Sequence, residues 1–175
     1  MSMNDFDRVV NLITDFCDQK HIIEVHESLQ DAGELVAWEH WLHVEFRHFL
    51  HHNDGIDDWE REETYLIDQR KNNSKSAARV DFSFRWKRTK ATRIILEFKA
   101  KYNYRNCIKA MIEDVKKIES LRKSEKLDIR NFYVVGFHSV EEDMSSDTIA
   151  EAIDDEGINF IYYPIGDSGC AVTIF

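Results

Sequence analysis

The chain has 175 residues, 43% of them hydrophobic, and a formal net charge of −10 at pH 7. A chain of this length can bury one proper core, so we expect a single domain over residues 1–175. No apolar run approaches the roughly 20 residues that span a membrane, and nothing resembles a signal peptide. The three cysteines are odd in number and widely spaced, which indicates neither a disulfide framework nor a zinc knuckle. We therefore expect a cytoplasmic protein with no membrane partner.

The charge is divided unevenly along the chain. Residues 1–69 carry 4 basic and 17 acidic side chains, and residues 70–130 carry 19 basic and 7 acidic ones. Residues 131–175 carry 9 acids and no Lys or Arg. A basic field of this kind attracts phosphate backbones, while acidic flanks limit non-specific binding. The alternative is that the oppositely charged segments pair with one another across the fold.

Three helices are expected before residue 53. Their patterns predict helices from Asn4, as the cap, to about Lys20, from about Ile22 to Gln30, and from Glu34 to about His52. Gly33 is the predicted break between the last two. In the third helix Glu45 lies in the middle of the apolar stripe, where a carboxylate is costly unless it is paired or bound to a metal. Glu39 falls on a different face and is predicted to be an ordinary solvated residue.

Five histidines crowd this third helix, and His48 and His52 have the i,i+4 spacing of a metal-binding pair. No cysteine or carboxylate motif completes a zinc set. The favoured interpretation is a solvated helix end whose charge is sensitive to pH at about pH 6.

A β-hairpin is predicted from about Ala77 to Ala100, after an acidic loop over residues 57–63 that carries Trp59 and a strand near residues 64–70. Apolar and polar residues alternate along both of its strands, as in half-buried strands. A loop over residues 87–91 then sets the apolar pairs Trp86 with Thr92, Phe84 with Ile94, Phe82 with Leu96, and Val80 with Phe98. A slip of one residue would bury the charged side chains, so the register is well specified.

The same register places Asp81 directly opposite Glu97, with Lys99 next along that face. Opposed like charges repel, and a close pair of carboxylates raises one of their pKa values unless a positive group lies between them. Mg²⁺ and Mn²⁺ prefer such oxygen ligands, and a neighbouring ammonium can hold an attacking water or stabilise charge on phosphate. The alternative is a solvated strand face that carries charges and no site.

The rest of the chain alternates helix and strand. We predict a helix over about residues 105–124, a buried strand over 132–137, a short helix over about 147–156, and strands near 159–163 and 170–175. Ser145 or Ser146 is the predicted cap of the short helix. On the first of these helices Lys109, Lys116 and Lys123 form one stripe, which is either a solvated face or a path for phosphates. Asp114 and Lys117 are predicted to form an exposed i,i+3 pair.

The expected order is a helix, three antiparallel strands, a helix and a strand, with Asp81 on the second strand and Glu97-Phe98-Lys99 on the third. This pattern resembles the PD-(D/E)XK nuclease superfamily over roughly residues 34–138, although Val80 stands where the family motif has proline. The resemblance implies an α/β fold with an αβββαβ, restriction-endonuclease-like core, whose central mixed sheet is flanked by helices. The N-terminal helices and C-terminal strands would be additions to it.

The resemblance also implies roles for individual residues. Asp81, Glu97 and Glu45 would bind Mg²⁺, assisted by the backbone carbonyl of Phe98, and Mn²⁺ would substitute for it. Lys99 would position or activate the hydrolytic water. DNA is the implied partner, alongside a homodimer or a partner subunit as further options. The nucleic-acid contacts are assigned to Arg79, Arg85, Lys101, Tyr104, Arg105 and Lys109.

The leading hypothesis is therefore a metal-dependent nuclease, an endonuclease that hydrolyses DNA phosphodiester bonds. The alternative is a non-catalytic module of the same fold that binds nucleic acid or a protein. A third hypothesis, an acidic mimic of nucleic acid, suits the flanks but not the basic centre. The pattern does not distinguish duplex, single-stranded and branched DNA, because a fold alone does not determine a substrate.

Overall fold

The structure, a computed structural model, describes residues 3–32, 38–68, 70, 76–89, 92–121, 123–154 and 157–175. Its helices are α1 (Asp5–Cys17), α2 (Lys20–Ala32), α3 (Trp38–His51), α4 (Tyr104–Glu119), α5 (Lys123–Lys126) and α6 (Ser146–Ile153). Its strands are β1 (Ile56–Arg61), β2 (Thr64–Leu66), β3 (Ala77–Arg79), β4 (Phe82–Trp86), β5 (Arg93–Ala100), β6 (Ile129–Ser139), β7 (Ile161–Pro164) and β8 (Cys170–Ile174).

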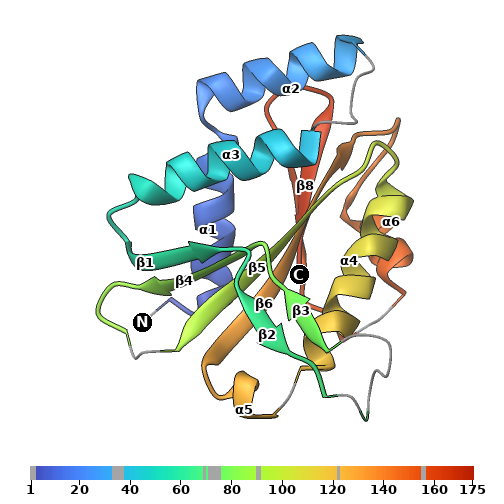
Figure 1. Cartoon of the computed structure of the whole chain (residues 1–175). Coiled ribbons are helices and arrows are strands. Elements are labelled where there is room, and N and C mark those ends of the chain that lie inside the picture. Colours follow the sequence, from blue (N-terminus) through green and yellow to red (C-terminus); the bar gives the residue numbers. More distant parts are fainter. Residues whose placement is uncertain are drawn as a thin grey trace.

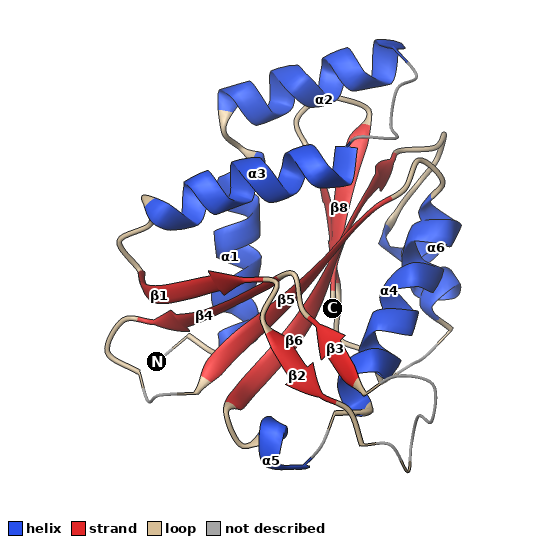
Figure 2. Ribbon diagram, viewed as in Figure 1, coloured by secondary structure: helices blue, strands red, loops and turns tan. Residues whose placement is uncertain are grey.

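Six of these strands form one mixed sheet in the order β1-β4-β5-β6-β8-β7 (Figure 1). β5 and β6 are parallel, and the other neighbouring pairs are antiparallel. A parallel pair needs a long crossover connection, and α4 supplies it. β2 and β3 pair with each other in a separate two-stranded sheet. The predicted α/β class, with a central mixed sheet flanked by helices, is confirmed (Figure 2).

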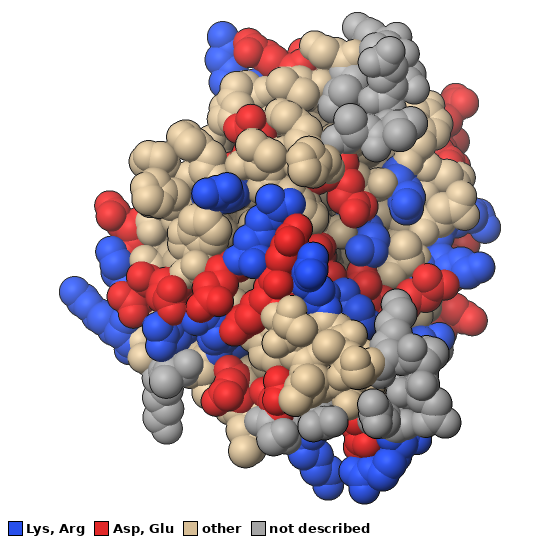
Figure 3. Space-filling model, viewed as in Figure 1, with Lys and Arg blue, Asp and Glu red and all other residues tan. Residues whose placement is uncertain are grey.

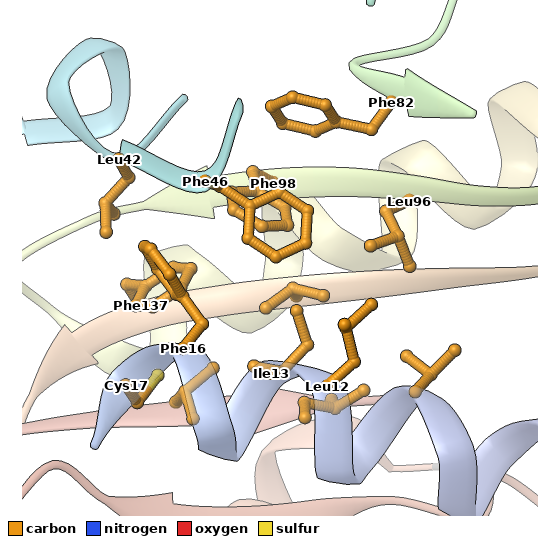
Figure 4. Packing of buried hydrophobic residues seen from close by; sticks show 14 of the residues in the cluster. Leu12, Ile13, Phe16, Cys17, Leu42, Phe46, Phe82, Leu96, Phe98 and Phe137 are labelled. Atoms are coloured by element: carbon orange, nitrogen blue, oxygen red, sulfur yellow. The ribbon is translucent and has the colours of Figure 1, made fainter. Parts of the chain in front are cut away.

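One face of the sheet is covered by α1, α2 and α3. Aromatic rings dominate this layer: the centroids of Phe46 and Phe98 lie 4.8 Å apart, and those of Phe46 and Phe82 lie 5.1 Å apart. Figure 4 shows Phe16 of α1 and Phe46 of α3 meeting Phe137 and Phe98 of the sheet. These contacts hold α3 against β4 and β5, the strands that carry the predicted acids.

The other face is covered by α4, α6 and the small β2–β3 sheet. Gly136 of β6 lets α4 come close, because a Cβ atom there would lie 2.2 Å from Met111 Sδ and 2.8 Å from Cys107 Sγ. Farther along α4, Ile118 packs with Ile95 of β5 and Tyr65 of β2. α4 therefore lies directly over β5 and β6.

The hairpin register is confirmed where β4 and β5 pair. Phe82, Ser83 and Phe84 oppose Leu96, Ile95 and Ile94, respectively. The hairpin is shorter than predicted, because Ala77–Arg79 pairs with β2 instead of continuing β4.

Val80 differs from its predicted place opposite Phe98. Its backbone N–H donates to the Glu63 carbonyl, and its side chain joins Ile95 on the α4 side of the sheet. The chain bends at Asp81, whose carboxylate accepts a hydrogen bond from the Phe98 backbone N–H at 2.8 Å. A side chain thus takes the place of the next ladder bond.

The prediction of an acidic loop over residues 57–63 is wrong for most of that segment. Ile56–Arg61 forms β1 and pairs with β4 at the edge of the sheet. The strand could not be recognised from its polar sequence, because the acids on one side of β1 pair with cations of the neighbouring strands. Asp58, for example, lies 2.6 Å from Arg85 Nη2 and 2.9 Å from Arg93 Nη1.

The helix caps follow the sequence closely. Asn4 accepts a hydrogen bond from the Asp7 backbone N–H at 2.8 Å, and Ser145 forms a capping box with Thr148 at the start of α6. The predicted break at Gly33 and the start at Glu34 lie outside the described residues. Within the described part of the chain, no helix combines the length and apolar character that a membrane span requires.

Candidate active site

The predicted acids meet at one end of the β4–β5 pair. Glu97 lies on β5 with 1% of its surface exposed, and Asp81 lies in the bend that precedes β4. The hydrogen bond from the Phe98 backbone N–H holds the Asp81 carboxylate against β5 at 2.8 Å. The two carboxylates therefore lie beside the same short segment of β5, as the register predicts.

Two residues of α4 complete an alternating set of charges. Lys117 Nζ lies 2.5 Å from Glu97 Oε1 and 3.3 Å from Asp114 Oδ1, and Lys99 Nζ lies 2.7 Å from Asp114 Oδ2. The order Glu97, Lys117, Asp114, Lys99 thus alternates negative and positive groups between β5 and α4. We call these four residues the charge chain.

The prediction that Asp114 and Lys117 form an exposed pair is wrong. Asp114 is 8% exposed, because α4 packs with this side against β5. Lys117 also donates to the Arg79 carbonyl at 3.1 Å, which ties α4 to the end of β3. Sequence spacing placed the two residues on one face of the helix but did not tell which surface that face meets.

The surroundings raise the pKa values of both Glu97 and Lys99, which favours the neutral form of the acid and the charged form of the lysine. Burial, reinforced by the negative charge of Asp81, raises the pKa of Glu97 to about 8, although Lys117 opposes the change. Burial would lower the pKa of Lys99, but the hydrogen bond and charge of Asp114 outweigh it and raise that pKa. Lys99 therefore stays a cation at neutral pH. A further positive charge near Glu97, such as a metal ion, would stabilise its ionised carboxylate.

α3 contributes two further groups, which the sequence analysis did not assign to the site. Glu39 accepts a hydrogen bond from the Ala100 backbone N–H at 3.1 Å, and His43 Nε2 lies 3.7 Å from Asp81 Oδ2. Burial lowers the pKa of His43 in spite of the opposing charges of Asp81 and Glu39. The prediction that Glu39 is an ordinary solvated residue is therefore wrong. The i,i+4 spacing of Glu39 and His43 is the signal that could have paired them.

Glu45, the acid that the sequence analysis chose, lies elsewhere. Its carboxylate forms an ion pair with His21 of α2 at 3.3 Å, and its side chain is 26% exposed. Six helical positions separate it from Glu39, which turns it about 120° away around α3. The structure therefore does not bring Glu45 to Asp81 and Glu97, and the acid that α3 places at the end of β5 is Glu39.

The residues assigned to nucleic-acid contact differ in whether they are exposed, paired with an acid, or buried. Lys101, Arg105 and Lys109 are exposed on or beside α4, as that role requires. Arg79 is exposed and lies 3.4 Å from Glu62, and Arg85 is partly buried against Asp58 of β1. Figure 3 shows positive and negative side chains interleaved across the middle of this face, between α3 and the β2–β3 sheet.

Tyr104 does not fit the role it was assigned. It is 2% exposed and packs with Cys107 and Ile108 under the first turn of α4. As the first residue of a helix that lies against the sheet, it points into the core, so it is not available to a nucleic acid.

The donor chemistry fits a hard divalent cation, with two carboxylates and one carbonyl. Asp81 and Glu97 supply carboxylate oxygens, and Phe98, the residue after Glu97, supplies a backbone carbonyl. Lys99 Nζ donates to this carbonyl at 3.1 Å, so ammonium groups contact the oxygens that the resemblance assigns to a metal. Among the described residues, no three His, Cys, Asp or Glu side chains are gathered closely enough to hold a metal ion by themselves.

Comparison with protein-family models, with curated proteins and with solved structures finds no match to this chain. The candidate site is therefore defined by its own geometry: Asp81, Glu97 and Lys99 at the end of β5, Asp114 and Lys117 from α4, and Glu39 and His43 from α3.

Proposed function

We propose that this protein is a Mg²⁺-dependent endonuclease that hydrolyses DNA phosphodiester bonds. The observation that carries the proposal is the buried charge chain beside Asp81. Burying Glu97 and Asp114 together is costly, and Lys117 and Lys99 lie 2.5 Å and 2.7 Å from them. Buried charged groups that are held in fixed positions beside one another are typical of a site where charge develops during a reaction.

The arrangement of elements supports a divergent PD-(D/E)XK nuclease. The series α3, β1, β4, β5, α4 and β6 follows the αβββαβ order, with three antiparallel strands and a parallel fourth. The β2–β3 sheet would then be an insertion between the first two core strands. α1, α2, β7 and β8 would be additions outside the core.

The chain's own residues would divide the work as follows. Mg²⁺ bound to Asp81, Glu97 and the Phe98 carbonyl would supply neutralising charge at the scissile phosphate and favour deprotonation of a water. Lys99 would hold that water or the charge that builds on phosphate, since Asp114 keeps it positive and oriented.

α3 would support the same geometry from the other side of the sheet. Glu39 bonds the backbone N–H of Ala100, one residue beyond Lys99, and His43 lies beside Asp81. Both are positioning residues in this proposal, because they fix the end of β5 and the Asp81 carboxylate without a reacting role of their own.

One observation favours a second candidate function. Lys117 lies 2.5 Å from Glu97, where its ammonium neutralises the carboxylate without any metal. A non-catalytic module that binds nucleic acid or a protein would be stable in this state. Cleavage assays separate the two functions.

The test is Mg²⁺- and Mn²⁺-dependent cleavage of duplex, single-stranded and branched DNA by the wild type, Lys99→Ala and Lys20→Ala. Lys20 is an exposed cation of α2, so its removal controls for a general loss of positive charge. Cleavage by the wild type and Lys20→Ala that is lost in Lys99→Ala supports the nuclease. Cleavage that survives in Lys99→Ala overturns this site, and binding of DNA without cleavage by any of the three supports the non-catalytic module.

A further inference from the structure

A pocket opens on the α3 side of the sheet, between the C-terminal half of α3 and the edge strand β1. It has a volume of about 350 Å³, which lies within the range of small-ligand sites. Its lining consists of Val44, Arg47, His48, His51 and Trp59. Val44 is 48% exposed, so apolar surface is accessible here. The lining adds the Trp59 ring, the Arg47 cation and two imidazole rings.

Alternation along β1 separates its charges. Asp58 and Glu60 oppose Arg85 and Ser83 of β4 and lie on the side where both acids pair with Arg93. Successive side chains of a strand point to opposite faces. Trp59 and Arg61 therefore lie on the other side, toward α3.

The two arginines on this side are suited to a polyanion. The Arg47 guanidinium carbon lies 6.0 Å from the centroid of the Trp59 ring, and within the described residues Arg47 forms no ion pair. The buried Nε of Arg61 has no hydrogen-bond partner in the described part of the chain, although its Nη2 lies 3.5 Å from Glu62. Arg47 is exposed and the Arg61 side chain is 26% exposed, so a phosphate would pair with the solvent-facing donors of these guanidinium groups.

The pocket is connected to the candidate site through the sheet. Arg61 opposes Phe82, the residue after Asp81, and Trp59 opposes Phe84. Three residues along β4 and one strand spacing separate the backbones of Trp59 and Asp81, which is roughly 11 Å along the sheet. A stacked strand advances about 3.4 Å per nucleotide, so the pocket would lie about three nucleotides from a phosphate at Asp81.

We propose that this pocket binds one unstacked base of a single-stranded DNA segment. The base stacks on Trp59, and Arg47 and Arg61 contact the flanking phosphates. Base stacking on an aromatic ring, with cations along the backbone, is how proteins hold single strands without reading their sequence. The inference rests on the proposed function for its choice of ligand, and it narrows the substrate to DNA with an unpaired segment.

The test measures the binding of a fluorescein-labelled thymidine oligonucleotide by anisotropy, with Ca²⁺ in place of Mg²⁺. Trp59→Leu keeps an apolar side chain against β4 and removes the stacking surface, and Lys20→Gln on α2 is the matched control for Arg47→Gln. We expect Trp59→Leu to weaken binding roughly tenfold. Arg47→Gln should lower the slope of log affinity against log salt by about 0.7, and Lys20→Gln should change neither quantity.

A second readout separates stacking from a general disturbance of the fold. In a series of oligonucleotides, each with one base replaced by an abasic site, replacement at one position should weaken binding to the wild type. The same replacement should have no effect in Trp59→Leu, since the partner of that base is already missing. Urea denaturation of each variant verifies that it is folded.

The failure of this inference differs from the failure of the proposed function. Unchanged binding in folded Trp59→Leu, or a wild type that binds no single strand, overturns the pocket, whatever the cleavage assay shows. Binding that depends on Trp59 without any cleavage supports the pocket and overturns the nuclease. Stronger binding to intact duplex than to single strands also overturns the proposed base pocket, because a paired base cannot enter it.

Discussion

Lys117 Nζ lies 2.5 Å from Oε1 of Glu97, a carboxylate with 1% of its surface exposed. This contact joins the middle of α4 to β5, and it extends through Asp114 to Lys99. Removing one member of such a set leaves an opposite charge buried and unpaired, which costs more than the pair itself contributes. Stability, metal binding and activity should therefore all respond to these residues, each with its own pH dependence.

Lys117→Met should destabilise the fold, by about 1–3 kcal/mol. The loss should be greater at pH 8.5 than at pH 5, because Glu97 can relieve the unpaired charge by taking up a proton at low pH. Urea denaturation at both pH values measures it. The double variant Lys117→Met/Glu97→Gln is the control, and it should recover part of the loss. Equal losses at the two pH values would contradict an ionised Glu97 as the cause.

The affinity for Mn²⁺ should rise with pH in the wild type. Since burial raises the pKa of Glu97 to about 8, a proton competes with the metal for this carboxylate across the neutral range. Below that pKa the affinity should increase up to tenfold for each pH unit. Calorimetry in two buffers of different ionisation enthalpy would detect the released proton. Glu97→Gln should remove both the pH dependence and most of the binding, and a wild-type affinity independent of pH would contradict this assignment.

Glu39 and Glu45 provide a matched comparison on one helix. Glu39→Gln should slow DNA cleavage roughly 10- to 100-fold, because it weakens the hydrogen bond that holds the end of β5 beside Lys99. Glu45→Gln should leave the cleavage rate and the Mn²⁺ affinity unchanged, because Glu45 pairs with His21. The cleavage rate and the metal affinity of each variant check this prediction. The reverse outcome would return the role to Glu45.

His26 should make the fold sensitive to acid. Its Nδ1–H donates to the Ile22 carbonyl at 2.7 Å, and its Nε2 accepts from the Trp38 indole N–H at 3.2 Å, so the buried ring is neutral. Burial lowers its pKa from 6.5 to about 4. Between these values the unfolded chain binds the proton and the folded chain does not. The free energy of unfolding should therefore fall as the pH drops from 6.5 to 4, by up to about 3 kcal/mol.

Urea denaturation at pH 7, 6 and 5 measures this effect. His43 and His138 are also buried with lowered pKa values, so they act in the same direction. His26→Gln is the control: it should be less stable at pH 7 but lose less stability on acidification. An unchanged pH slope in this variant would exclude His26 as the source.

Part of the fold follows from local sequence. The β4–β5 register, the Asn4 and Ser145 caps, and the nearness of Asp81 to Glu97 were all predictable. Each depends on residues close together in the chain, where a period of 2 or a cap motif sets which side chains share a face.

The tertiary structure decided what those faces meet. β1 was hidden because an edge strand that pairs its acids with arginines lacks an apolar alternation. Glu39 rather than Glu45 reaches β5, and the Asp114–Lys117 pair is buried rather than exposed, because of how α3 and α4 are rotated against the sheet. Periodicity specifies a helix face, but the partner of that face is chosen by packing between segments distant in sequence. The sequence alone therefore determined the Asp81–Glu97–Lys99 motif, and only the packing of α3 and α4 determined which groups surround it.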